Sequence, residues 1–178
     1  MSAGDRAHWV IDLLTSTNRP GLRFADGFPN GLVIHSTATP EATAKNIWDY
    51  FQNNPQVEAS AHMAIDWTEA RVLIPLLANP EIAWHCGHTG NHRFVGVELC
   101  ESADPGKFAA MYANALEVCS TIIHFYGWVV DDLYVWSHDR VSLTFHETDH
   151  TDPIGFFASH GKTWAQFMVD LDKVVTAV

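Results

Sequence analysis

The sequence predicts an α/β fold with a single mixed central β-sheet of about five strands, flanked by about three main helices. Three helix-like segments are interleaved with short apolar runs along the 178 residues, and this alternation is typical of one sheet covered by helices. A chain of this length fits one domain with a substantial core. Apolar residues make up 47% and charged residues 17% of the chain, which is an ordinary globular composition. We therefore expect residues 1–178 to form one domain.

The first expected elements are a lead-in, a strand and a helix. Residues 1–30 are expected to be irregular, since glycine and proline recur toward their end. The apolar run 31–34 predicts a buried strand. Thr39 as N-cap and Pro40 at the first helical position then predict a helix that runs to about Asn53. The side chains expected to be buried on this helix are Ile47, Tyr50 and Phe51.

Four further strands are expected. Residues 61–66 and 71–76 are two short apolar runs separated by four residues, which predicts an antiparallel hairpin. Residues 94–99 and 133–138 predict two more strands. A long loop is expected to follow over residues 139–161.

Two further helices have recognisable ends. Asp104 and the proline after it predict the start of a long helix over residues 106–126, and Gly127 is placed to end it. Thr163 and Gln166 have the spacing of a capping box, so the last helix is expected to start there and continue to the C-terminus.

Charge and composition exclude several classes of partner. The formal charge is −11, with 21 acidic against 10 basic residues, whereas binding to nucleic acid requires clustered basic residues. No segment has the length of a membrane span, and residues 1–14 lack the apolar stretch of a secretory signal. The three cysteines lack CxxC spacing, which predicts free buried thiols, with a bridge between two of them as the alternative.

Three residues far apart in the chain are candidate metal ligands. His35 and His138 each end a strand-like run, and Asp152 precedes a proline that favours an extended backbone. Two imidazoles and one carboxylate suit zinc and leave a fourth position open for water, as in catalytic sites. His146 and His150 flank the Asp152 region and compete with it as ligands.

An acidic residue inside an apolar strand is the second unusual feature. Glu98 shares a strand face with Gly96, and a carboxylate is rarely buried without a partner. Either Glu98 lies on the solvated face of an edge strand, or it accepts a proton beside a metal. Gly96 would let another group approach the backbone closely on the same face. His85 is expected to line a cleft, and the alternative is a separate metal site formed by His85, Cys86 and His88.

Together these residues resemble the zinc-dependent N-acetylmuramoyl-L-alanine amidases of type 2, which share a fold with peptidoglycan recognition proteins and many phage endolysins. The resemblance extends from about Gly31 to the final helix. Five segments match in order, and no single one of them is decisive. They are residues 32–38, residues 59–66, residues 83–87 with Asn91 and 95–98, residues 137–139, and residues 150–153.

The resemblance implies a role for each candidate residue. Glu98 would be the general base, and His150 takes the place of a family lysine that helps to stabilise the oxyanion. His146 remains an alternative to the third metal ligand. The implied zinc ligands are His35, His138 and Asp152. The residues implied to line the cleft and hold the substrate are His62, His85 and Asn91.

The implied activity is hydrolysis of the amide bond between N-acetylmuramic acid and L-alanine in peptidoglycan. The expected protein is a monomer that is made without a signal peptide and acts on the bacterial cell wall, as a phage or prophage lysin does. Two alternatives are a non-catalytic peptidoglycan-binding module and a cytoplasmic amidase that recycles muropeptides. The His-Glu-x-x-His pattern of helical zinc peptidases is missing.

Overall fold

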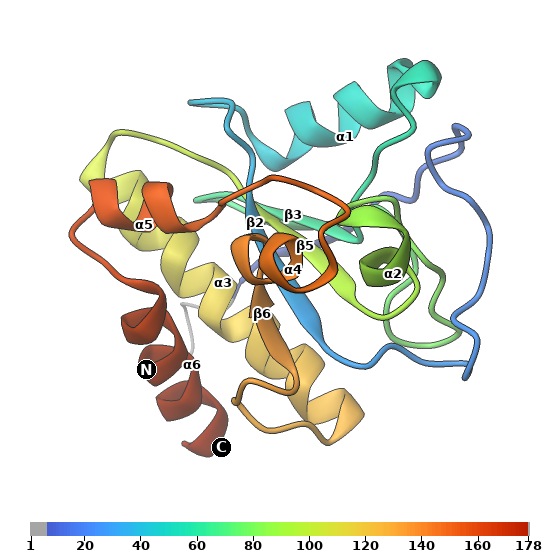
Figure 1. Ribbon diagram of the computed structural model, residues 1–178. Helices are drawn as coiled ribbons and strands as arrows, with labels where there is room; N and C mark the ends of the chain where they lie inside the picture. Colours follow the sequence, from blue (N-terminus) through green and yellow to red (C-terminus); the bar gives the residue numbers. More distant parts are fainter. Residues whose placement is uncertain (1–6, 178) are drawn as a thin grey trace.

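A computed structural model describes residues 7–177, and its central element is a six-stranded mixed sheet (Figure 1). The strand order is β1-β4-β3-β5-β2-β6, and every neighbouring pair is parallel except β3–β4. The predicted α/β class with a mixed sheet is therefore confirmed. The strands are β1 (Trp9–Ile11), β2 (Leu32–Ser36), β3 (Met63–Ile65), β4 (Ala70–Val72), β5 (Val95–Leu99) and β6 (Val135–Ser137).

Helices cover both faces of this sheet (Figure 1). The side chains of α3 and α6 pack on one face around Leu32 and Val97, and those of α1 pack on the other face around Ala64. Burial on both faces explains why β2 is apolar until its last two residues. The helices are α1 (Ala44–Asn53), the 3-10 helix η1 (Pro55–Val57), α2 (Gly87–Asn91), α3 (Pro105–Tyr126), α4 (His138–Phe145), α5 (Ile154–Ser159) and α6 (Trp164–Thr176).

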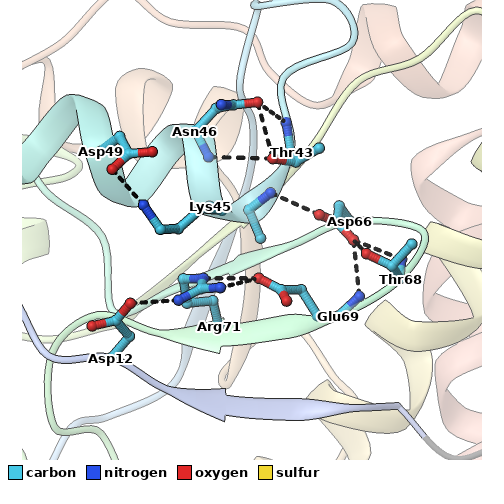
Figure 2. A network of polar contacts seen from close by, with 10 residues as sticks. Asp12, Thr43, Lys45, Asn46, Asp49, Asp66, Thr68, Glu69 and Arg71 are labelled. Carbon is cyan, nitrogen blue, oxygen red and sulfur yellow. Dashed lines mark hydrogen bonds and ion pairs between the residues drawn. The ribbon is translucent and has the colours of Figure 1, made fainter.

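Strand β1 was not among the five expected strands. It lies in the segment expected to be irregular, which corrects that expectation for residues 9–11. β1 is short, only partly buried, and pairs in parallel with β4. Just after it, Asp12 forms an ion pair with Arg71 of β4, which also pairs with Glu69 (Figure 2). The strand is therefore defined by contacts with a distant hairpin. Residues 1–6 of the lead-in lie outside the described residues.

Helix α1 begins four residues later than predicted. Thr43 is the N-cap and forms a capping box with Asn46, while the backbone N–H of Ala44 donates to buried Asp66 at 2.8 Å (Figure 2). These contacts satisfy the free N–H groups of the first turn. Ile47 and Phe51 are buried as expected. Tyr50 was expected in the core but is half exposed.

The segment expected to be a loop contains two short helices, α4 and α5. Ser137 ends β6, and its hydroxyl accepts from the N–H of Arg140, so α4 starts directly at His138. In α6, Thr163 accepts from the N–H of Gln166, but the Gln166 side chain donates to Asp170. Only half of the expected capping box therefore forms.

Other expectations agree with the fold. β3 and β4 form the predicted antiparallel hairpin, and Asp104 caps α3, which Gly127 ends in a left-handed conformation. The three cysteines are free and buried. Within residues 7–177, no helix combines the length and apolar character needed to cross a bilayer.

Candidate active site

Three donor side chains converge at the ends of two neighbouring parallel strands. His35 lies near the end of β2, His138 directly follows β6, and Asp152 comes from the segment before α5. The Nδ1 atoms of His35 and His138 are 3.0 Å apart, and they lie 3.4 and 3.1 Å from the two carboxylate oxygens of Asp152. One donor atom from each residue falls within 4.8 Å of the others. The fold therefore assembles the three predicted candidates into one cluster.

This cluster fits a zinc ion. Zinc–nitrogen and zinc–oxygen bonds of about 2.0–2.2 Å in a tetrahedral arrangement place donor atoms roughly 3.3 Å apart. The two Nδ1 atoms are 3.0 Å apart, and each lies 3.1–3.4 Å from one of the two carboxylate oxygens of Asp152, which is close to this spacing. Two imidazole nitrogens and one carboxylate are also the donor set of open, catalytic zinc sites.

Further hydrogen bonds orient each of the three side chains. The Nε2 atom of His35 is 2.9 Å from Nδ1 of His85, and Nε2 of His138 is 3.2 Å from the hydroxyl of Thr148. Asp152 accepts from the N–H of Ser36 at 3.1 Å. Such outer partners set the tautomer and ring orientation of metal ligands. The sequence does not predict this role of Thr148, because it lies among varied residues that form no distinguishing pattern.

Burial and the neighbouring charges favour the protonation states of His35 and Asp152 that can bind a metal. Burial lowers the pKa of His35 to about 4, although the neighbouring carboxylate of Asp152 acts in the opposite direction. Burial alone would raise the pKa of Asp152, but its contacts with His138 and His35 outweigh it and hold that pKa below its ordinary value. A neutral imidazole and an ionised carboxylate are the forms that bind a metal.

Glu98 lies beside this cluster on the same face of the sheet. It pairs in register with His35 across β5 and β2, and paired residues of parallel strands project to the same side. Its side chain is only partly exposed, and its Oε2 has no hydrogen-bond partner within the described part of the chain. Burial, followed by the charges of Asp152 and Glu101, raises the pKa of Glu98 to about 8. Its strand, β5, lies between β3 and β2 in the sheet, which excludes the alternative that Glu98 is on an edge strand.

A cavity of about 580 Å³ opens over these residues. Its floor holds the donor cluster and Glu98, and the segment 36–42 and helix α1 form part of its wall. Asn46 and Tyr50 of α1 face it, which explains the exposure of Tyr50. The candidate residues that line it are His35, His85, Glu98, His138, His150 and Asp152.

Two residues expected to hold the substrate do not lie on the cavity wall. His62 is fully buried, and its ring accepts from the N–H of Gly96 and donates to the carbonyl of Glu81. The side-chain oxygen of Asn91 accepts from the N–H groups of His85 and Cys86. Backbone groups thus occupy both ring nitrogens of His62 and the side-chain oxygen of Asn91, and a contact of these residues with substrate stays a prediction.

The remaining histidine candidates separate into two groups. His150 stacks on His138 with ring centroids 4.6 Å apart, and its Nδ1 is 3.5 Å from Asp152, so it stands at the exposed rim of the cluster. His146 ends α4 with a positive φ of 57°, is exposed, and is outside the donor cluster. The structure thus excludes His146 as the third member of this cluster.

The absence of a side chain at Gly96 is required by close packing. A Cβ atom there would lie 2.6 Å from Cγ and Nδ1 of the His85 ring. We expect Gly96→Ala to lower the free energy of unfolding by about 1–3 kcal/mol and to displace His85. Chemical denaturation measures this loss. Gly155→Ala is the matched control, since nothing lies within 4 Å of its added Cβ, and equal stability of the two variants would contradict the prediction.

An α/β fold in which three metal donors and a further carboxylate line one cavity has the arrangement of groups typical of a metal-dependent hydrolase. The family model described as N-acetylmuramoyl-L-alanine amidase matches residues 25–155, and the chain belongs to this family. The bifunctional autolysin of Staphylococcus aureus is 32% identical over 146 residues, which are 79% of this chain but 11% of the autolysin. The chain thus spans a small part of this curated relative.

Solved structures support the same relationship. A hydrolase of Staphylococcus aureus, AmiA, solved in complex with its ligand, has a TM-score of 0.86 and 26% identity, covering 96% of this chain and 84% of that one. A mutant endolysin from Bacillus subtilis has a TM-score of 0.73 and 26% identity, covering 93% of this chain and 99% of that one.

Proposed function

We propose that this chain hydrolyses the amide bond between N-acetylmuramic acid and L-alanine in peptidoglycan, with zinc as its metal. The observation that carries the proposal is the meeting of three metal donors and Glu98 at the floor of one cavity. Family membership and the likeness to an autolysin and an endolysin support the same chemistry. His35, His138 and Asp152 would hold the metal.

The residues around the cluster supply the remaining steps. When bound, zinc supplies Lewis-acid polarisation of a carbonyl and acidifies water. Glu98 accepts the proton of the attacking water and returns it to the leaving amine. A cation nearby favours the ionised form of Glu98, which its burial otherwise opposes. His150, at the exposed rim, donates a hydrogen bond to the oxygen that becomes negatively charged.

We further propose that the chain acts as one catalytic domain on the bacterial cell wall, in the manner of a phage or prophage lysin. The cavity is open to the surface beside α1, so a polymer can reach it without unfolding of the rim. The formal charge of −11 disfavours binding to nucleic acid. We propose a monomer.

Purified peptidoglycan tests this function and its metal requirement together. Cleavage is expected to expose the amino group of L-alanine on the stem peptides, and mass spectrometry should find intact lactyl groups on the glycan. Treatment with a chelator should abolish the release, and stoichiometric zinc should restore it. Binding to peptidoglycan without cleavage would identify a recognition module instead. Cleavage of soluble muropeptides alone would identify a recycling enzyme.

A further inference from the structure

A chain of hydrogen bonds leads from His35 through His85 to a backbone carbonyl. Nε2 of His35 is 2.9 Å from Nδ1 of His85, and Nε2 of His85 is 3.1 Å from the carbonyl oxygen of Phe94. The ring planes of His35 and His85 are nearly perpendicular, at 84°. His85 therefore contacts Nε2 of His35, whereas Asp152 lies near Nδ1 of the same ring.

The carbonyl at the end sets the direction of this chain. A carbonyl oxygen only accepts hydrogen bonds, so Nε2 of His85 must carry the proton. Nδ1 of neutral His85 is then an acceptor, and Nε2 of His35 must be the donor. As a result, the unprotonated Nδ1 of neutral His35 faces His138 and Asp152. This is the tautomer that a metal requires at that atom.

Several groups hold the His85 ring in the position that these bonds need. Its ring lies over the backbone of Gly96, where an added Cβ would come within 2.6 Å. The Asn91 side chain accepts from the N–H of His85 at 2.7 Å and so anchors its backbone. The buried ring of His62 meets the ring of His85 edge to face at 5.7 Å. His62 and Asn91 thus act on His85, although neither touches the cavity.

We propose that His85 is a positioning residue, whose hydrogen bond fixes the tautomer and ring orientation of His35 and thereby raises the affinity of the cluster for a divalent metal ion. This inference rests on the proposed metal-dependent function. His85 has no donor role toward the metal itself, since its Nδ1 is engaged by His35 and its Nε2 by Phe94.

Two substitutions separate the bond to His35 from the rest of the packing. The oxygen of an asparagine at position 85 takes the place of Nδ1, so His85→Asn keeps an acceptor for His35. The amide nitrogen of a glutamine takes the place of Nε2, so His85→Gln keeps the donor to Phe94 and loses the acceptor.

Zinc affinity is measured by competition with a chelator, and the visible spectrum of bound cobalt(II) reports the ligand geometry. Thermal unfolding without metal reports the packing.

We expect His85→Gln to weaken zinc binding by about 10–100-fold and to alter the cobalt spectrum, while His85→Asn recovers most of the affinity. Equal zinc affinity in wild type and both variants would overturn the role of His85 and leave the proposed function intact. Equal losses in both variants would also overturn it, by assigning the effect to packing. A wild-type chain that binds no zinc would refute the proposed function itself.

Nitrogen-15 NMR of histidine in the wild-type protein gives a test that needs no variant. We expect both His35 and His85 to carry their proton on Nε2 in the metal-free protein. A proton on Nδ1 of His85 would overturn the proposal, whatever the variants do.

Discussion

Glu98→Gln is expected to lower the rate of amide hydrolysis by about 10²–10⁴-fold while the protein still binds zinc. The amide has the shape of the carboxylate but accepts no proton, and Glu98 is outside the donor cluster of His35, His138 and Asp152. The rate of amine release from peptidoglycan measures the first effect, and metal analysis measures the second. A variant that keeps zinc and near wild-type activity would show that Glu98 is not the base.

The same substitution is expected to stabilise the metal-free protein at neutral and alkaline pH. The pKa of Glu98 is about 8 in the folded chain and has its ordinary, lower value in the unfolded chain. Near neutral pH the folded wild-type protein therefore keeps a proton on Glu98 that the unfolded chain has lost. The stability of the wild-type protein that depends on protonated Glu98 is present at acidic pH and is lost as pH rises toward 8. A difference of one between the folded and unfolded pKa values corresponds to about 1.4 kcal/mol, so the gain should be a few kcal/mol at most.

Thermal unfolding in a chelator, followed from pH 5 to pH 9, checks this second effect. The difference in melting temperature between Glu98→Gln and wild type should increase with pH and level off above about pH 8. A difference that is constant over this range would mean that ionisation of Glu98 does not limit stability.

Asp152→Ala is expected to remove zinc and activity together. Asp152 supplies the only carboxylate of the donor cluster found within the described residues, and both His35 and His138 lie within 3.4 Å of it. Its loss leaves two neutral nitrogens, a set too small for a stable zinc site. Zinc per chain, determined by metal analysis, should fall from stoichiometric to near zero, and peptidoglycan cleavage should fall to background.

His146→Ala is the matched control for this prediction. His146 comes from the same part of the chain but is exposed and outside the cluster, so its removal should leave zinc content and activity unchanged. Zinc retained by Asp152→Ala, or lost by His146→Ala, would contradict the assignment of Asp152 as the third ligand.

The elements with strong local patterns were predictable from the sequence. β2 and β5 are apolar because both faces of the sheet are covered, and α3 has an aspartate cap at its start and a left-handed glycine at its end. These signals lie within a few residues of the elements they define, so no tertiary information was needed. β1 and the start of α1 depend on partners such as Arg71 and Asp66, which are far away in sequence.

The sequence alone determined which residue types were available for the site: two strand-end histidines, an aspartate before a proline, and a glutamate in an apolar strand. Only the tertiary structure decided their arrangement. It brought His35 and His138 together across 103 positions of the chain, left His146 outside the donor cluster, and left His62 and Asn91 out of the cavity lining. The physical reason is that residue type sets what a side chain can donate or accept, whereas its actual partner depends on which distant backbone and side-chain groups the packed sheet brings within about 3 Å.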